Sequence, residues 1–97
     1  MPHYVAIVED VGPETAIGIW FPDLPGCFSA GDDVDDALRN AEEAVSLYAE
    51  SLAEDGKPMP APRSLKALRD DPEVAPGLKE YMVALVPYPT RHAHAAE

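Results

Sequence analysis

Basic side chains are scarce in this sequence, and the first 38 residues contain no lysine or arginine. The 97 residues carry 18 acidic and seven basic side chains, which gives a formal net charge of −11. DNA, RNA and anionic membrane surfaces repel a chain with this balance. We therefore expect no direct nucleic-acid binding and no membrane binding, and we expect a basic partner.

Cysteine and long apolar runs are also nearly absent. Cys27 is the only cysteine, so it has no partner for an internal disulfide, and we expect it to be a small buried side chain in a strand. The sequence has no apolar run of about 20 residues, the length that a transmembrane helix needs, and no signal peptide at its start. These absences predict a cytoplasmic protein.

Motifs of catalysis are missing as well. There is no glycine-rich phosphate loop and no serine in the setting of a catalytic nucleophile. Cys27 and the histidines His3, His92 and His94 form no recognisable pair of nucleophile and base. The residues therefore predict a protein that is not an enzyme, with no cofactor and no metal.

What the sequence does contain is concentrated acidity. Residues 1–56 hold 13 acidic side chains and Arg39 as the one base, a net charge of −12, whereas the remaining 41 residues have a net charge of +1. A charge run of this kind either faces solvent and aids solubility or forms a docking face for a basic partner. Both interpretations stay open on composition alone.

Short apolar runs predict a small sheet. Residues 3–9 and 16–21 are rich in β-branched and aromatic side chains and flank a turn with Gly12 and Pro13, which is typical of a hairpin. A rigid turn at residues 22–26, in which Gly26 offers a positive φ, leads to a third strand at 27–30. A last strand is predicted at residues 79–86.

One long amphipathic helix is predicted after the third strand. Asp32 and Asp33 are good N-cap residues, and Gly56 is a good C-terminal stop. Apolar residues between them recur on one helical stripe. They are Val34, Ala37, Leu38, Ala41, Val45, Tyr48 and Leu52.

The segment after the helix is rich in proline. Alternate prolines in residues 57–62 favour an extended strap. Ser64 can cap a short helix that runs to Arg69, and residues 74–77 are predicted to be a loop. Residues 91–97 lack a core pattern and are predicted to be a disordered tail.

This order, β-β-β-α-(short α)-β, predicts a single two-layer α+β domain over residues 1–90, in which the helical stripe covers one face of the sheet. The strand at residues 3–9 is apolar on both faces. One long helix cannot cover both of them, although the short helix can cover part of the second. We therefore expect an exposed apolar sheet face as a dimer or partner surface, and a homo-oligomer.

Four aspartates crowd the start of the long helix: Asp32, Asp33, Asp35 and Asp36. Free N–H groups and the helix dipole stabilise anions there, which explains the cluster without any ligand. The alternative is a divalent-cation site, completed by Asp23. Trp20 and Phe21, beside the rigid turn, are core residues or, for one ring, an exposed aromatic anchor.

Five runs of residues form a recognisable pattern. They are Tyr4-Val5-Ala6-Ile7-Val8-Glu9, Ile19-Trp20-Phe21-Pro22-Asp23-Leu24-Pro25-Gly26-Cys27, Ala30-Gly31-Asp32, Asp36-Ala37-Leu38-Arg39-Asn40-Ala41 and Glu54-Asp55-Gly56-Lys57-Pro58-Met59-Pro60-Ala61-Pro62. Over roughly residues 3–86 the sequence resembles the HicB antitoxin family, the antitoxin halves of HicA–HicB type II toxin–antitoxin systems. The resemblance implies a partial RNase H-like fold.

The resemblance also implies a function. The domain would bind a small basic HicA-type toxin, which cleaves mRNA, and occlude it through an acidic surface. Many family members continue into a segment that binds operator DNA, and no such segment follows here, so we expect no DNA-binding domain. The residues that we predict to contact the partner are Trp20, Asp23, Leu24, Asp32, Asp33 and Asp36.

Two other functions compete with this hypothesis. One is a metal-dependent nuclease with an RNase H-like fold, which would use Asp23 together with the Asp32 to Asp36 cluster. The other is an orphan module whose role is self-assembly through the bare sheet face.

Overall fold

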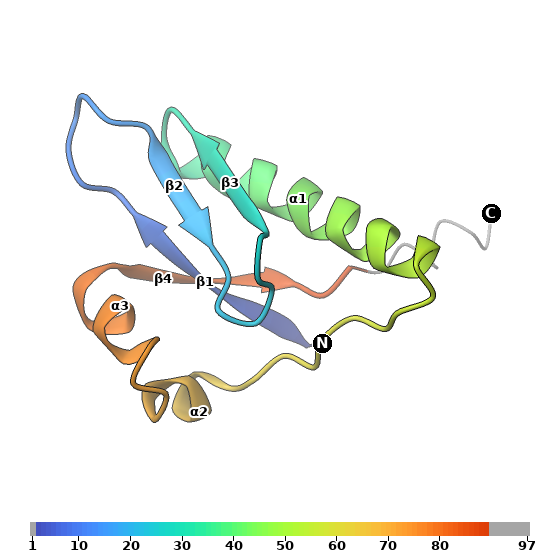
Figure 1. Ribbon diagram of the computed structural model, residues 1–97. Coiled ribbons are helices and arrows are strands. Elements are labelled where there is room, and N and C mark those ends of the chain that lie inside the picture. The colour runs from blue at the N-terminus through green and yellow to red at the C-terminus, as the bar shows by residue number, and fades with distance from the viewer. Residues whose placement is uncertain (1, 90–97) are drawn as a thin grey trace.

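A four-stranded antiparallel sheet organises the protein, and its strand order is β3-β2-β1-β4. The computed structural model describes residues 2–89. A long helix lies along one face of the sheet, and two short helices lie on the other side (Figure 1). The elements are β1 (His3–Glu9), β2 (Ile17–Trp20), β3 (Phe28–Gly31), α1 (Val34–Glu54), α2 (Leu65–Arg69), α3 (Ala75–Glu80) and β4 (Met82–Pro87).

The hairpin predicted from the first two apolar runs is confirmed. β1 pairs with β2, with Val8 opposite Ile19, and also pairs with β4, with Tyr4 opposite Val86. This central position explains why β1 is apolar on both faces. Its five inner residues, Tyr4 to Val8, are all buried.

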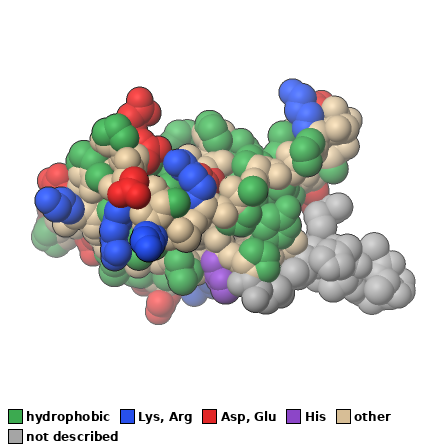
Figure 2. All heavy atoms as spheres, turned by 90° about the horizontal axis from the view of Figure 1, so that it is seen from below, with side chains coloured by type: hydrophobic (Ala, Val, Ile, Leu, Met, Phe, Trp, Pro, Cys, Tyr) green, Lys and Arg blue, Asp and Glu red, His purple; other side chains and the backbone are tan. Residues whose placement is uncertain are grey.

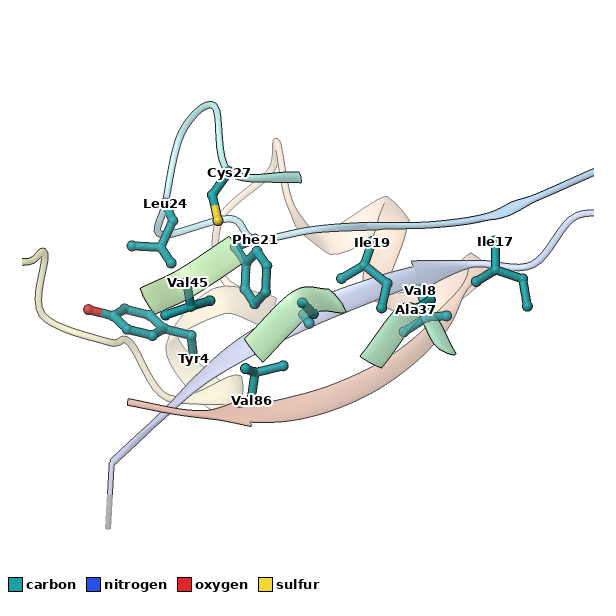
Figure 3. Close-up of a cluster of buried hydrophobic side chains, with 12 residues drawn as sticks. Tyr4, Val8, Ile17, Ile19, Phe21, Leu24, Cys27, Ala37, Val45 and Val86 are labelled. Atoms are coloured by element: carbon teal, nitrogen blue, oxygen red, sulfur yellow. The ribbon is translucent and has the colours of Figure 1, made fainter. Parts of the chain in front are cut away.

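The main core lies between the sheet and α1. Tyr4, Val8 and Ile19 point from the sheet toward Ala37 and Val45 of the helix (Figure 3). Phe21, Leu24 and Cys27 close one end of this core from the loop between β2 and β3. Cys27 is therefore buried, as predicted, but it lies in the loop and not in a strand, because β3 begins at Phe28. Burial raises the pKa of its thiol.

The second face of the sheet is not bare at its centre, and this part of the prediction is wrong. Val5 and Ile7 of β1 are 3% and 0% exposed because Leu68 and Val74 pack against them. The short helices α2 and α3 supply this cover. Sequence analysis predicted α2 and its partial cover of this face, but it missed α3, because an element of six residues is too short to show an amphipathic repeat.

The long helix has the predicted caps. The Asp33 carboxylate accepts a hydrogen bond from the Asp36 N–H at 2.8 Å, and Gly56, with φ +72°, follows the last turn. Ala37, Ala41, Val45 and Ala49 form its buried stripe. Small residues dominate that stripe, so the helix packs close to the sheet.

Two boundaries near the C-terminal strand differ from the prediction. Residues 74–77 are not a loop, because α3 begins at Ala75 with Pro76 in its first turn, where a missing N–H costs nothing. Lys79 and Glu80 belong to α3, so the last strand begins at Met82 instead of Lys79. The helix from Ser64 to Arg69 is confirmed, since the Ser64 hydroxyl accepts from the Ala67 N–H.

The proline-rich strap is tied to the sheet and its loops. The Tyr4 hydroxyl donates to the Pro60 carbonyl. Further along, the Arg63 backbone N–H and guanidinium both donate to Asp23, at 2.7 and 2.6 Å. The strap thereby brings α2 and α3 to the side of the sheet opposite α1.

The predicted tail at residues 91–97, with His92 and His94, lies outside the described residues. The α+β class is confirmed, whereas the partial RNase H-like detail stays a prediction. Within residues 2–89, no helix has the length and apolar character needed to cross a membrane.

Candidate partner-binding surface

The turn from β3 into α1 presents the acidic cluster. This turn packs closely against the helix, because a Cβ atom on Gly31 would come within 2.4 Å of the Ala37 backbone nitrogen. Only glycine allows the strand to end this close to the first helical turn. Asp32 and Asp33 therefore project from a rigid corner of the molecule.

Two of these aspartates have local structural roles. Asp33 caps the helix, and the Asp36 carboxylate accepts from the Asp32 N–H at 3.2 Å while it also pairs with Arg39 at 3.1 Å. The capping interpretation of the cluster is therefore confirmed for Asp33 and Asp36. Asp32 and Asp35 are exposed, and no hydrogen bond of their carboxylates is found within residues 2–89.

The acidic surface continues along the outer side of α1. Arg39 is the one base of this helix, and it lies beside Asp36. The exposed acids of the helix and its flanks are Asp32, Asp33, Asp35, Glu42, Glu43, Glu50, Glu54 and Asp55. A partner that approaches α1 from solvent thus meets a field of one sign.

An apolar groove interrupts the acidic surface between α1 and the start of β3. Its volume is about 270 Å³, and its lining includes Phe28, Leu47 and Tyr48. Phe28 is 70% exposed and Leu47 is 58% exposed. Exposed large apolar side chains inside a charged rim are typical of a protein-binding surface.

Sequence analysis missed both of these exposed residues. Leu47 does carry a signal, because it lies off the apolar stripe that includes Val45 and Tyr48. Phe28 carries none, since a short strand that reads Phe-Ser-Ala-Gly does not show which face is buried. In the structure Ser29, not Phe28, faces the helix, and its hydroxyl donates to the Ala37 carbonyl.

The other residues predicted as contacts do not join the aspartate cluster. Trp20 lies on the opposite face of the sheet, half-buried against the α2–α3 side, and its indole N–H donates to Glu9 at 2.8 Å. Phe21 is a core residue with 2% exposure. Trp20 and the acidic turn therefore do not share one surface.

Asp23 and Leu24 lie in the loop that precedes β3, whereas the aspartate cluster follows β3. Leu24 is 1% exposed, so its side chain supports the core and is not accessible to a partner in this conformation. The Asp23 side chain is 7% exposed and pairs with Arg63, which also pairs with Asp71 at 3.0 Å. These hydrogen bonds raise the pKa of the Arg63 guanidinium.

This arrangement does not assemble the alternative nuclease site. The Asp23 carboxylate is used by Arg63, away from the Asp32 to Asp36 cluster. Among the described residues, no three His, Cys, Asp or Glu side chains converge in a way that could hold a metal ion.

Comparison with known proteins identifies the family. The family model described as the HicB-like antitoxin of bacterial toxin–antitoxin systems matches residues 4–92. A 14.9 kDa protein of the rep–hol intergenic region of Haemophilus phage HP1 is 33% identical over 89 residues, which cover 92% of this chain and 62% of the phage protein. A UPF0150 protein of Synechocystis is 46% identical over 39 residues, covering 40% of this chain and 49% of that protein.

Solved structures agree with the sequence matches. The Burkholderia pseudomallei antitoxin HicB superposes with a TM-score of 0.75 at 28% identity, covering 94% of this chain and 66% of that one. A chain of a HicA3–HicB3 toxin–antitoxin complex superposes with a TM-score of 0.67 at 29% identity, covering 88% of this chain and 95% of that one.

The chain spans a little under two thirds of the length of the phage relative and of the Burkholderia antitoxin. The family match includes all four strands of the sheet, since it begins in β1 and runs past β4. This chain therefore belongs to the HicB-like antitoxin family of bacterial toxin–antitoxin systems.

Proposed function

We propose that this protein binds a small basic mRNA-cleaving toxin of the HicA type and occludes its RNA-binding surface. The acidic face of α1 and of the turn before it carries this proposal. Family membership and the HicA3–HicB3 complex among the structural neighbours support the choice of partner. Occlusion needs no catalytic group, so we propose that the protein is not an enzyme.

The acidic surface fits this role because it imitates the charge of the toxin's substrate. An enzyme that binds RNA presents a basic surface, and a field of opposite sign accelerates association by roughly 10–1,000-fold at low salt. Asp32 and Asp35 extend from the rigid corner after Gly31, so their positions change little on binding. A preorganised surface lowers the entropic cost of association.

Phe28 and Leu47 add an apolar anchor to that field. A charged surface alone speeds the encounter but holds a partner weakly, whereas a desolvated apolar contact slows dissociation. The groove between these two residues is open enough to receive one apolar side chain of the toxin. We propose that acidic steering and this groove act together.

Several further expectations belong to the same proposal. The described residues form one HicB-like domain within residues 1–90. It acts in the cytoplasm, forms a homo-oligomer and does not bind nucleic acid directly, which its net charge of −11 disfavours. Trp20, Asp23 and Leu24 contribute to partner binding through the shape of the sheet and its loop more than through direct contact.

A charge-removal experiment tests the proposal. The variant Asp32→Asn, Asp33→Asn, Asp36→Asn keeps an N-cap side chain, because asparagine caps helices as well as aspartate. We expect its association rate constant for the cognate HicA-type toxin to fall about tenfold at low salt. Stopped-flow mixing at several salt concentrations measures this rate, and an RNA-cleavage assay measures inhibition.

A matched control removes three negative charges elsewhere. The variant Asp70→Asn, Glu73→Gln, Glu80→Gln changes the net charge equally but lies on the α2–α3 side. Its association rate is expected to fall much less. Equal rates for both variants, or a Phe28→Ala variant with wild-type dissociation, would contradict this surface.

A further inference from the structure

The two edges of the sheet are protected very differently. β3, at one edge, has four residues and lies against α1, and the Ala30 carbonyl accepts from the Asn40 side chain at 2.8 Å. Ser29 is also bonded to the helix. The Asn40 side chain of α1 therefore occupies a backbone acceptor of β3 that another strand would need.

β4, at the opposite edge, lacks this protection. It has six residues, Met-Val-Ala-Leu-Val-Pro, without a single charged side chain. Met82 is 47% exposed and Leu85 is 60% exposed. In the described part of the chain, no hydrogen bond reaches β4 from any element except β1. Soluble proteins normally guard such an edge with charges, bulges or a covering element, because its free N–H and C=O groups attract another strand.

We infer that β4 pairs antiparallel with β4 of a second copy of this chain, so that two four-stranded sheets become one continuous sheet. The inference deepens the proposed homo-oligomer and does not depend on toxin binding. A two-fold axis perpendicular to the sheet relates the copies, which keeps both α1 helices on the same side.

The side chains of β4 fit this pairing. Residues opposite each other in an antiparallel pair point to the same face. With Ala84 at the axis, Val83 lies opposite Leu85 of the second copy on the α2–α3 side, and Met82 lies opposite Val86 on the α1 side. The β1 register assigns these faces, because Leu85 is paired with Val5 and Met82 with Val8. Both exposed side chains thus gain an apolar neighbour.

The β4 edge is a stretch of the surface where charge does not oppose the approach of a second copy. Each copy carries −11, and most surfaces of two copies repel each other, but residues 82–89 contain no charged side chain. Strand pairing over about 20 Å buries less than the roughly 1,200–2,000 Å² of a stable interface. The dimer is therefore weak, and it tightens at high salt, which screens the repulsion between the two copies.

Sedimentation equilibrium of the chain without toxin tests this inference. We expect a monomer–dimer equilibrium that tightens as salt is raised. Leu85→Lys and Met82→Lys each place a charge on one face of the edge, and each should weaken dimerisation at least tenfold. Val11→Lys is the matched control, since Val11 is 61% exposed in the β1–β2 turn, and it should dimerise like the wild type.

Each other outcome has a definite meaning. A chain that stays monomeric at millimolar concentration overturns self-association altogether. If neither lysine variant weakens the dimer, the chain self-associates, but β4 is not the interface. A monomeric chain whose toxin complex is weakened by Leu85→Lys assigns the edge to a toxin strand instead. Thermal unfolding by circular dichroism confirms that the variants are folded.

Discussion

The two faces of the sheet are stabilised in different ways. On the α1 face, a continuous helix of 21 residues covers a large core, whose members include Ile17 of β2 and Leu24 of the loop after it. On the other face, helices of five and six residues cover a small cluster built around Ile7 and Leu68. The α1 face therefore holds the larger of the two clusters of buried side chains.

The short helices α2 and α3 depend on their packing against the sheet. An isolated helix of fewer than about 12 residues is marginal in water, because helix nucleation is costly. α2 and α3 form because Leu68 and Val74 are buried against β1 and because Arg63 links Asp23 to Asp71. The α2–α3 layer is thus held by a few apolar contacts and by one polar clamp, the ion pairs of Arg63.

The outer surfaces of the two faces differ in charge as well. α1 is acidic apart from Arg39, whereas α2, α3 and the turn between them carry both bases and acids. They are Lys66, Arg69, Lys79, Asp70, Asp71, Glu73 and Glu80. Viewed from the side of the short helices, basic side chains gather among hydrophobic ones (Figure 2). The α1 side therefore has a field of one sign, whereas charges of both signs are mixed on the α2–α3 side.

The largest expected effect on stability is the difference between replacing a buried phenylalanine and replacing an exposed one. Phe21→Ala removes a core side chain of the α1 face and should lower the free energy of unfolding by about 3–5 kcal/mol. Phe28→Ala, at a residue 70% exposed, should change it by less than about 0.5 kcal/mol. Urea unfolding followed by circular dichroism measures both, and similar losses would refute the assigned core.

A smaller effect is expected on the α2–α3 face. Leu68→Ala should lower the free energy of unfolding by about 2–3 kcal/mol. It should also shift the emission of Trp20, the only tryptophan, to longer wavelength, because this ring packs against the same cluster. Leu47→Ala is the control, since Leu47 lies on α1 and is 58% exposed. A Trp20 emission unchanged in Leu68→Ala would show that the cluster does not close this face.

The smallest expected effect on stability concerns the polar clamp in which Arg63 links Asp23 to Asp71. The Glu73 N–H and Arg63 both donate to Asp71 and lower the pKa of that carboxyl. A lowered pKa in the folded state stabilises the protein above the ordinary aspartate value of about 4, and this stability is lost as pH falls through the folded pKa. Wild type should therefore be more stable than Asp71→Asn at pH 7, and this advantage should be smaller at pH 2. Urea unfolding of the two proteins at both values checks this, and a constant difference would contradict it.

Much of the framework was predictable because its causes are local. The hairpin follows from alternating strand and turn residues, and α1 follows from a 3.6-residue stripe bounded by Asp33 and Gly56. The acidic character of the α1 side also follows from the sequence, since a long amphipathic helix must face its charged side outward. The family resemblance was carried by these same segments and is confirmed by the family match.

The candidate site was only partly predictable. The aspartates at the start of α1 are adjacent in sequence, so their clustering was evident. Asp23 and Leu24 were predicted as contacts together with them, but Leu24 is in the core and Asp23 binds Arg63, 40 residues away. No local pattern reveals a partner at that separation.

Sequence alone thus determined the strands, the long helix, its caps and the uneven distribution of charge, because each depends on neighbours within a few residues. Tertiary structure alone decided that α3 forms, that Phe28 faces solvent, that the centre of the second sheet face is covered, and that β4 is the edge strand opposite β3. These features depend on which segments meet across the fold, and hydrophobic burial makes that choice for the whole chain at once.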